Sequence, residues 1–261
     1  MITMKEQAEQ FRKILQHMDR PKKATDKGIL IPYENLAYSC IEFTPGECYS
    51  FFGSQDTNTL SCWKTNLLWK LLQKGVSICV LEGGDSFRRD FAQMACLQAK
   101  IAPDMMLGGQ GDIEDLQAFT LGLKQIALFP MAWTTDEGIP PSLKGPMICV
   151  KNMTLDEWRE DAETLWTQAR ERNVVLFLFV AMPHYVPLTY DSLYHPYKII
   201  LPENLSSYVG MVKMEQSTGF PLEQQRMQLE LTLKQTESFT VEHLHFDIDP
   251  HSREISVASH I

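Results

Sequence analysis

Short apolar runs alternate with amphipathic stretches over the first two thirds of the chain, and this alternation predicts the fold class. The apolar runs predict buried strands at residues 47–52, 76–81, 127–133, 147–150 and 174–181. The amphipathic stretches predict helices at residues 60–74, 87–98, 112–126 and 155–172, and a loop rich in Gly and Met is expected at 101–111. Buried strands that alternate with helices form a mostly parallel sheet covered on both faces, which is an α/β fold.

The pattern changes beyond residue 197, where strand-like stretches follow one another with no clear helix between them. These stretches cover residues 197–201, 208–214, 227–234, 239–247 and 254–257. Turn-forming residues at 249–252, read as Asp-Pro-His-Ser, predict a hairpin between the last two. We therefore expect the sheet to continue as a C-terminal antiparallel extension.

The first 27 residues predict a separate element. Apolar residues recur at helical spacing between residues 3 and 18, and residues 20–27 are polar, basic and interrupted by Pro21. We therefore divide the chain into an N-terminal amphipathic helix and linker (1–27) and one α/β domain (28–261). An apolar stripe indicates that the helix packs against another protein surface but does not identify that surface. Docking on the same domain and docking on a neighbouring subunit both remain open.

The stretch between residues 44 and 85 carries the most informative motif, a strand that enters a polar loop and then a helix and a second strand. A phosphate-binding loop has the spacing G-x-x-x-x-G-K-[ST], in which the second glycine, the lysine and the hydroxyl hold phosphates and magnesium. Counted from Gly53, this chain has Asn58, Thr59 and Leu60 at those three positions. Asp56 adds a negative charge to a loop that should attract anions. The loop keeps the spacing of a nucleotide site without the residues that bind nucleotide.

The order of these features resembles the C-terminal ATPase domain of DnaB-type replicative helicases over residues 28–257. Residues 28–36 (GILIPYENL) are similar to that family's opening G-[IV]-x-T-G-[FY]-x-x-L segment, and residues 45–49 (PGECY) to its P-G-E-L strand. Residues 80–83 (VLEG) are similar to its S-L-E-M segment, so the resemblance gives Glu82 the position of the catalytic base. Residues 109–116 (GQGDIEDL) fall where the family has a turn between two helices. The resemblance implies a RecA-like, P-loop-NTPase-type three-layer sandwich and a setting in DNA replication or recombination.

The departures from this family pattern fall where hydrolysis would occur. The Walker B strand should end in a magnesium-binding Asp, whereas residues 147–150 are followed by Lys151. A later strand should end in S-Q-L-N-R, and residues 180–184 read V-A-M-P-H. These combined losses predict a pseudo-ATPase that needs no cofactor and in which Glu82 is a remnant. The degenerate ATPase domains of FtsK/EssC-type motors would give much the same pattern, so the family within the RecA-like superfamily stays open.

Charge, cysteine spacing and the absence of long apolar runs in the sequence indicate the class of partner, the state of the cysteines and the cellular compartment. The chain has 261 residues and a formal net charge of -9, which disfavours a stand-alone nucleic-acid binder. Its six cysteines show no C-x-x-C spacing and several lie in apolar runs, so we expect reduced core residues. The charged start of the chain is unlike a signal peptide and no apolar run has transmembrane length, which favours the cytoplasm.

Other candidate sites have simpler explanations. His243 and His245 alternate with apolar residues and could share a metal, but a solvent-facing strand gives the same pattern and no third ligand is fixed, so we predict no metal site. Ser54 lacks a base placed by sequence, and hydroxyls before a helix usually cap it. The basic linker could touch phosphate, although a solvated linker is the commoner case. Trp63 and Trp69 are expected in the core or at an interface.

Three functional hypotheses follow. The first is a non-catalytic DnaB/RecA-like protein that acts by binding a protein partner, namely a helicase, a recombinase or copies of itself. The alternative is an atypical NTP-dependent helicase subunit that binds ATP and magnesium. In it Glu82 acts as the base, and the missing lysine is supplied from elsewhere or by a neighbouring subunit. A weaker third option is a single-strand DNA binder that uses loops such as residues 182–190, against which the acidic charge counts.

Overall fold

The computed structural model describes residues 28–33, 42–54, 59–81, 85–136, 138–182, 206, 208–216, 227–235, 241–249 and 251–257. The predicted N-terminal helix, the basic linker, the strand at 197–201 and the loop beyond Met182 lie outside the described residues, as do Asp56, Asn58 and Glu82. Two short strands that the sequence did not predict, β1 (Ile29–Leu30) and β2 (Glu42–Phe43), pair antiparallel ahead of the main sheet.

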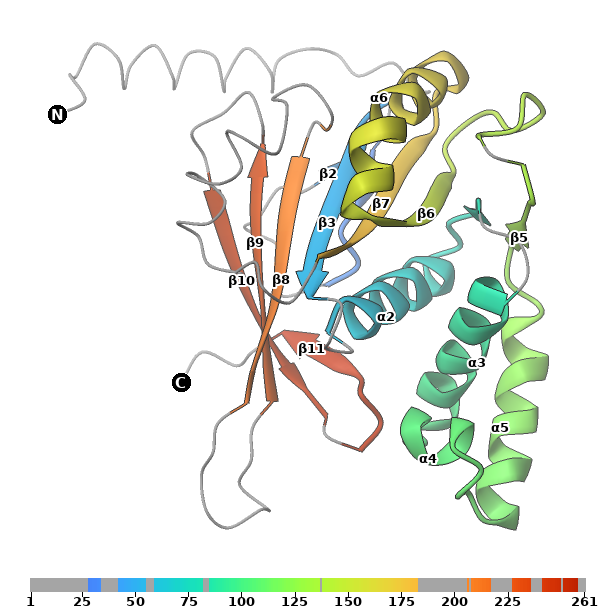
Figure 1. Ribbon diagram of the computed structural model, residues 1–261. Helices are drawn as coiled ribbons and strands as arrows, with labels where there is room; N and C mark the ends of the chain where they lie inside the picture. The colour runs from blue at the N-terminus through green and yellow to red at the C-terminus, as the bar shows by residue number, and fades with distance from the viewer. Residues whose placement is uncertain are drawn as a thin grey trace, which may run out of the picture.

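A nine-stranded sheet forms the centre of the molecule, in the order β11-β10-β9-β8-β3-β7-β6-β4-β5 (Figure 1). From the N-terminus these strands are β3 (Cys48–Ser54), β4 (Ile78–Val80), β5 (Met131–Trp133), β6 (Ile148–Thr154), β7 (Val175–Met182), β8 (Tyr208–Gln216), β9 (Met227–Gln235), β10 (Val241–Ile248) and β11 (Ile255–Val257). The part from β8 to β5 is parallel, and β9, β10 and β11 add antiparallel strands at the other end. The predicted α/β class and the C-terminal antiparallel extension are confirmed.

The sheet separates two apolar cores, because successive side chains of a buried strand point to opposite faces. In β7, Val175, Phe177 and Phe179 face one core, while the residues between them face the other. The first core is covered by α2 (Thr59–Gln73), α3 (Asp85–Ala99) and α5 (Ile113–Ile126), and the second by α6 (Leu155–Arg172). This arrangement is a three-layer α/β/α sandwich.

Several helix ends match local sequence signals. Asp112 accepts hydrogen bonds from the backbone N–H groups of Glu114 and Asp115 at 2.9 Å each, so the acidic start of α5 is a capping box. Thr154 and Glu157 form the same motif at the start of α6, which ends at Asn173 in the left-handed conformation. The predicted bounds of α6 are confirmed.

Two predictions about local structure were wrong. Residues 101–111 were predicted as a loop, but Pro103–Leu107 form a short helix, α4; Pro103 lies at its first turn, where a missing N–H costs nothing. The strand at 208–214 was assigned to the antiparallel extension, but β8 runs parallel to β3 on one side and antiparallel to β9 on the other. Strand direction at such a junction depends on the chain's path and leaves no mark in the side-chain pattern.

The C-terminal hairpin is attached to α2 through a buried amide. The Asn66 side chain donates to the Arg253 carbonyl oxygen and accepts from the Ile255 N–H, both at 2.9 Å. Within the predicted turn, the Asp249 carboxylate accepts from the N–H groups of His251 and Ser252 at 2.9 and 2.7 Å. These contacts lower the pKa of Asp249, and the predicted hairpin is confirmed.

Candidate functional site

The site predicted from sequence lies where β3 passes into α2, at the carboxyl edge of the parallel strands. α/β sheets bind their ligands at this edge, at the ends of strands that are buried on both faces. Gly53 is the second-last residue of β3, which ends at Ser54, and α2 begins at Thr59. The structure therefore brings Gly53, Thr59 and Leu60 together, while Asn58 and Glu82 lie outside the residues it describes.

Leu60 packs directly against Gly53. A Cβ atom added at Gly53 would lie 2.8 Å from the Leu60 Cβ, closer than real carbon atoms approach. The Leu60 side chain is 9% exposed and belongs to the core shared by α2 and the sheet. At the position where a nucleotide site has a magnesium-binding hydroxyl, this protein places an apolar side chain that joins strand to helix.

The hydroxyl groups near the start of α2 are directed to a neighbouring helix. Thr59 is 2% exposed. Ser61 and Thr65 both donate to the Gln93 Oε1 on α3, at 3.1 and 2.9 Å. The Ser61 and Thr65 hydroxyls thus link α2 to α3, a structural role that differs from the helix capping expected from the sequence.

A buried ion pair lies one turn further along α2. The Lys64 Nζ lies 2.8 Å from the Asp90 Oδ1 and donates to the Asn152 Oδ1, also at 2.8 Å. The lysine and aspartate side chains are 7% and 2% exposed. Burial raises the pKa of Asp90, and the positive charge of Lys64 opposes the rise. The second oxygen of Asp90 accepts no hydrogen bond from the described residues.

The sequence analysis missed this pair, although a signal for it was present. Lys64 follows Trp63 and precedes Leu67 and Leu68, so helical spacing places it on the apolar side of α2. A charged residue on that side needs a partner, and Asp90 on the next helix supplies it. Of the two lysines of α2, Lys64 and Lys70, Lys64 is the closer in sequence to the altered loop, and its side chain leans toward the helix N-terminus.

The structure changes which residue of β6 should be compared with the Walker B aspartate. The strand predicted at 147–150 continues to Thr154, so Lys151 lies inside β6 and does not follow its end. Lys151 forms an ion pair with Asp161 of α6 at 3.6 Å, on the opposite face of the sheet from Lys64. Its neighbour Asn152 is the residue that faces α2. No carboxylate from this part of β6 is available for magnesium, because the strand contains none.

The histidine strand has the arrangement expected for a solvent-facing surface. His243 and His245 are exposed on β10, while Leu244, Phe246 and Ile248 are buried. Asp247 accepts a hydrogen bond from Gln228 at 3.1 Å. In the part of the chain that the structure describes, no group of three or more His, Cys, Asp or Glu side chains could hold a metal.

Other sequence predictions fall in the core as expected. Trp63 and Trp69 are buried, at 0% and 6% exposed. Four of the described cysteines are buried, Cys62 is partly buried, and none of the five forms a disulfide. Among the described residues, no helix is both long and apolar enough to cross a membrane.

No family model matches this chain, and no curated protein matches it. Solved structures do match. A DnaB-like replicative helicase described with its interactions with primase aligns with a TM-score of 0.70 at 8% identity, over 95% of this chain and 68% of that one. A second solved structure, of an ATPase domain, aligns with a TM-score of 0.67 at 9% identity, over 98% and 99% of the two chains. The chain has the fold of a DnaB-like ATPase domain. The flagellar accessory protein FlaH from Methanocaldococcus jannaschii aligns more weakly, with a TM-score of 0.49 at 11% identity over 90% of this chain and 100% of that one.

The fold therefore agrees with the resemblance seen in the sequence. The sequence comparison with that family concerned residues of β3, α2 and β6. Gly53 keeps the residue of the family's loop pattern, Thr59 and Leu60 do not, and β6 contains no carboxylate.

Proposed function

We propose that this protein is a non-catalytic, DnaB/RecA-like pseudo-ATPase of the cytoplasm that acts in DNA replication or recombination through a protein partner. The observation that carries the proposal is the packing of Leu60 on Gly53, which uses the start of α2 for core contacts. A phosphate-binding loop needs this region as an open, polar cradle.

The charges around the loop support the same proposal. Phosphoryl transfer depends on cations that neutralise the phosphates, and the altered loop contributes Thr59 where the lysine should be. Lys64 is already held by Asp90 and Asn152. Moving its ammonium to a nucleotide would leave Asp90 buried and unpaired, a change that costs about 3–5 kcal/mol in comparable buried pairs.

The choice of partner class rests on the fold and on the surface. The likeness to DnaB-like helicases supports a setting among replication proteins, and the helicase at 8% identity is itself described with a partner, primase. The formal net charge of -9 supports a protein partner over nucleic acid. A helicase, a recombinase and a second copy of this chain are the partners to test first.

An ATPase assay on the full chain tests the non-catalytic part of the proposal. We expect hydrolysis of ATP with magnesium to stay at the background rate, and Glu82→Gln to leave that rate unchanged. Robust hydrolysis that Glu82→Gln abolishes would reject the proposal in favour of an atypical NTP-dependent helicase subunit. The matched control is a rebuilt loop, Asn58→Gly with Thr59→Lys and Leu60→Thr, compared with the unmodified chain for nucleotide binding, since β6 contains no carboxylate to support hydrolysis.

A further inference from the structure

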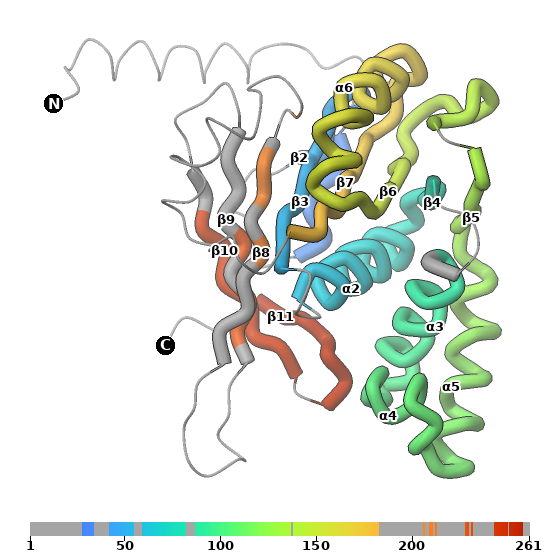
Figure 2. The backbone as a smooth tube through the Cα atoms, viewed as in Figure 1, coloured from blue at the N-terminus to red at the C-terminus, as the bar shows by residue number. Residues whose placement is uncertain are grey.

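The outward face of α5 is apolar although the helix already buries another face. α5 packs against α3, where a Cβ atom on Gly122 would lie 2.7 Å from the Ala95 carbonyl oxygen, and Ile126 is fully buried. The two helices lie side by side (Figures 1 and 2). On the outward face, Ile113, Leu116 and Leu121 remain 73%, 52% and 57% exposed. A helix that packs on one side needs no second apolar stripe.

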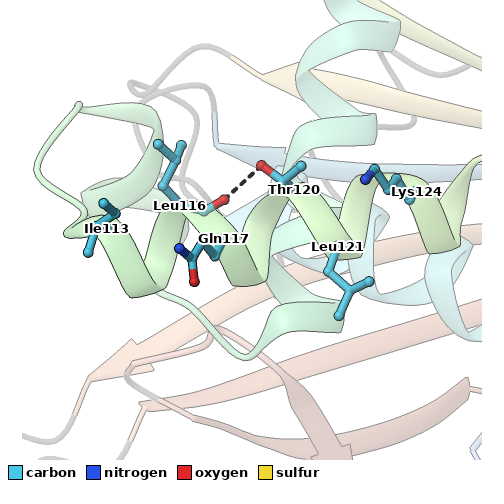
Figure 3. Close-up of a pocket in the computed structure, with 6 residues that line it drawn as sticks. All are labelled: Ile113, Leu116, Gln117, Thr120, Leu121 and Lys124. Carbon is cyan, nitrogen blue, oxygen red and sulfur yellow. Dashed lines mark hydrogen bonds between the residues drawn. The ribbon is translucent and has the colours of Figure 1, made fainter.

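The exposed stripe surrounds a shallow groove, and Figure 3 looks onto it. Its lining residues are Ile113, Leu116, Gln117, Thr120, Leu121 and Lys124. Ile113 and Lys124 lie at the two ends. The Thr120 hydroxyl donates to the Leu116 carbonyl oxygen at 2.8 Å, so its hydrogen bond is satisfied inside the helix and its methyl group adds to the apolar surface.

The spacing of these residues reads the same in both directions. Along the helix the steps between lining residues are three, one, three, one and three. If a second α5 were laid antiparallel on the first, Leu116 of each would meet Leu121 of the other. Gln117 would meet Thr120, and Ile113 would meet Lys124. Any helix face has this spacing, but here the opposed side chains at the centre also match in kind, with leucine against leucine and amide against hydroxyl, as an isologous dimer contact requires.

The charges of α5 fit the same antiparallel arrangement. Asp112, Glu114 and Asp115 lie at the N-terminus of the helix, and Lys124 lies in its last turn. In the pair, the Lys124 stem would cover Ile113 of the other copy, and its ammonium would reach the acidic N-terminus beside it. A parallel pair would instead place like charges together at both ends. The middle of the face carries no charged residue, as expected for the centre of an interface.

We propose that two copies of this chain form a two-fold symmetric dimer through antiparallel packing of α5 on α5. The inference rests on the proposed function for its role, because it names a second copy as the protein partner. Leu116 and Leu121 form the apolar centre of the contact, and Lys124 with the acidic N-terminus of α5 sets its direction.

Disulfide cross-linking of the full chain tests the direction and register. Two differently tagged chains, one with Ile113→Cys and the other with Lys124→Cys, are mixed and oxidised. We expect the mixed pair to cross-link, while each variant alone does not, because equal positions would be separated by about 16 Å along the axis. Cross-linking of Ile113→Cys with itself would indicate parallel packing and contradict the proposal.

The mass in solution tests the contact itself. We expect a dimer for the unmodified chain, with Leu116→Glu and Leu121→Glu each raising its dissociation constant by about 30-fold or more. Leu30→Glu, at a leucine of β1 that is 70% exposed, is the matched control and should leave the mass unchanged. Lys124→Glu should weaken the dimer, and adding Glu114→Lys should recover part of the loss.

The outcomes separate this inference from the proposed function. A monomer at concentrations up to about 100 μM would overturn the inference, since such a contact could not support specific pairing. An oligomer without the cross-link between positions 113 and 124 would also overturn it and direct attention to another occupant, such as residues 3–18 of a neighbouring copy. Neither result depends on nucleotide, so the pseudo-ATPase proposal is tested separately, by assays of nucleotide hydrolysis and binding.

Discussion

At the scale of residues, two side chains of α2, Leu60 and Lys64, have defined partners in the region where β3 passes into the helix. Leu60 fills the space beside Gly53, and Lys64 neutralises Asp90 where the helix approaches β6. Leu60 takes part in core packing, and the ammonium of Lys64 is held by Asp90 and Asn152. The Leu60 contact contributes to packing and the Lys64 contact to charge balance, both within one chain. Stability measurements can therefore test them without any ligand.

The contact between Gly53 and Leu60 predicts a non-additive pair of substitutions. We expect Gly53→Ala to destabilise the protein by about 1–3 kcal/mol, because the added methyl overpacks against Leu60. Leu60→Ala alone should cost about 2–5 kcal/mol through the cavity it leaves. In the Leu60→Ala background the contacts of this methyl with the Leu60 Cγ and Cδ1 are lost while the contact with Cβ remains, so its cost should fall in part. Urea unfolding of the four proteins measures the coupling, and simple additivity would show that the two side chains do not meet.

The buried ion pair predicts a dependence on pH. Lys64→Met should destabilise the protein by about 3–5 kcal/mol near neutral pH, because it leaves the Asp90 carboxylate buried and unpaired. The pKa of Asp90 is already raised by burial, and losing the lysine raises it further. The folded variant then binds a proton at a pH where the unfolded chain does not, so its deficit should shrink as pH falls toward that pKa.

The control for this prediction is the double variant Lys64→Met with Asp90→Asn, in which neither charge is buried. It should recover much of the lost stability, and its remaining deficit should vary less with pH. Urea unfolding from pH 5 to pH 8 makes the comparison. A deficit of Lys64→Met that grows as the pH falls would contradict the assignment.

At the scale of elements, the sequence predicted most bounds because each signal was local. α6 carries a capping box at Thr154 and Glu157 and a left-handed residue at Asn173, which mark both ends within the chain itself. Of the two elements predicted wrongly, one depends on distant partners and the other gives too short a local signal. The direction of β8 is set by β3 on one side and β9 on the other, and α4 is too short to show a helical period.

The cap of α6 gives a prediction at this scale. Thr154→Ala should destabilise the protein by about 1 kcal/mol, since its hydroxyl accepts the Glu157 N–H at 3.3 Å. Thr154→Ser keeps the hydroxyl and should lose much less. The Thr154 N–H and hydroxyl lower the pKa of Glu157, so this contribution is present above the ordinary pKa of a glutamate and is lost as pH falls through the lowered value. Thermal unfolding at pH 7 and below pH 4 compares the two variants, and equal losses would rule out the cap.

At the scale of the whole molecule, the spacing of apolar residues along the sequence was enough to predict the architecture. Continuous apolar strands alternating with amphipathic helices specify a parallel sheet with two cores, and the structure has both. Counting from Gly53 predicted an altered loop, and this stays a prediction because residues 55–58 lie outside the described part of the chain. The Lys64–Asp90 pair and the second apolar face of α5 were missed, because each is defined by which helix lies beside which.

The measurement that tests the loss of the nucleotide site most directly is a thermal unfolding titration of the full chain with ATP and with ADP, each with magnesium. A ligand that binds only the folded state stabilises it by RT ln(1 + [L]/Kd), so even a weak site would add roughly 1 kcal/mol at millimolar nucleotide. We expect no saturable shift, because Leu60 packs where the cradle would open and Lys64 is held by Asp90. A saturable, magnesium-dependent rise in Tm would contradict the pseudo-ATPase proposal and give the lead to a nucleotide-dependent helicase subunit.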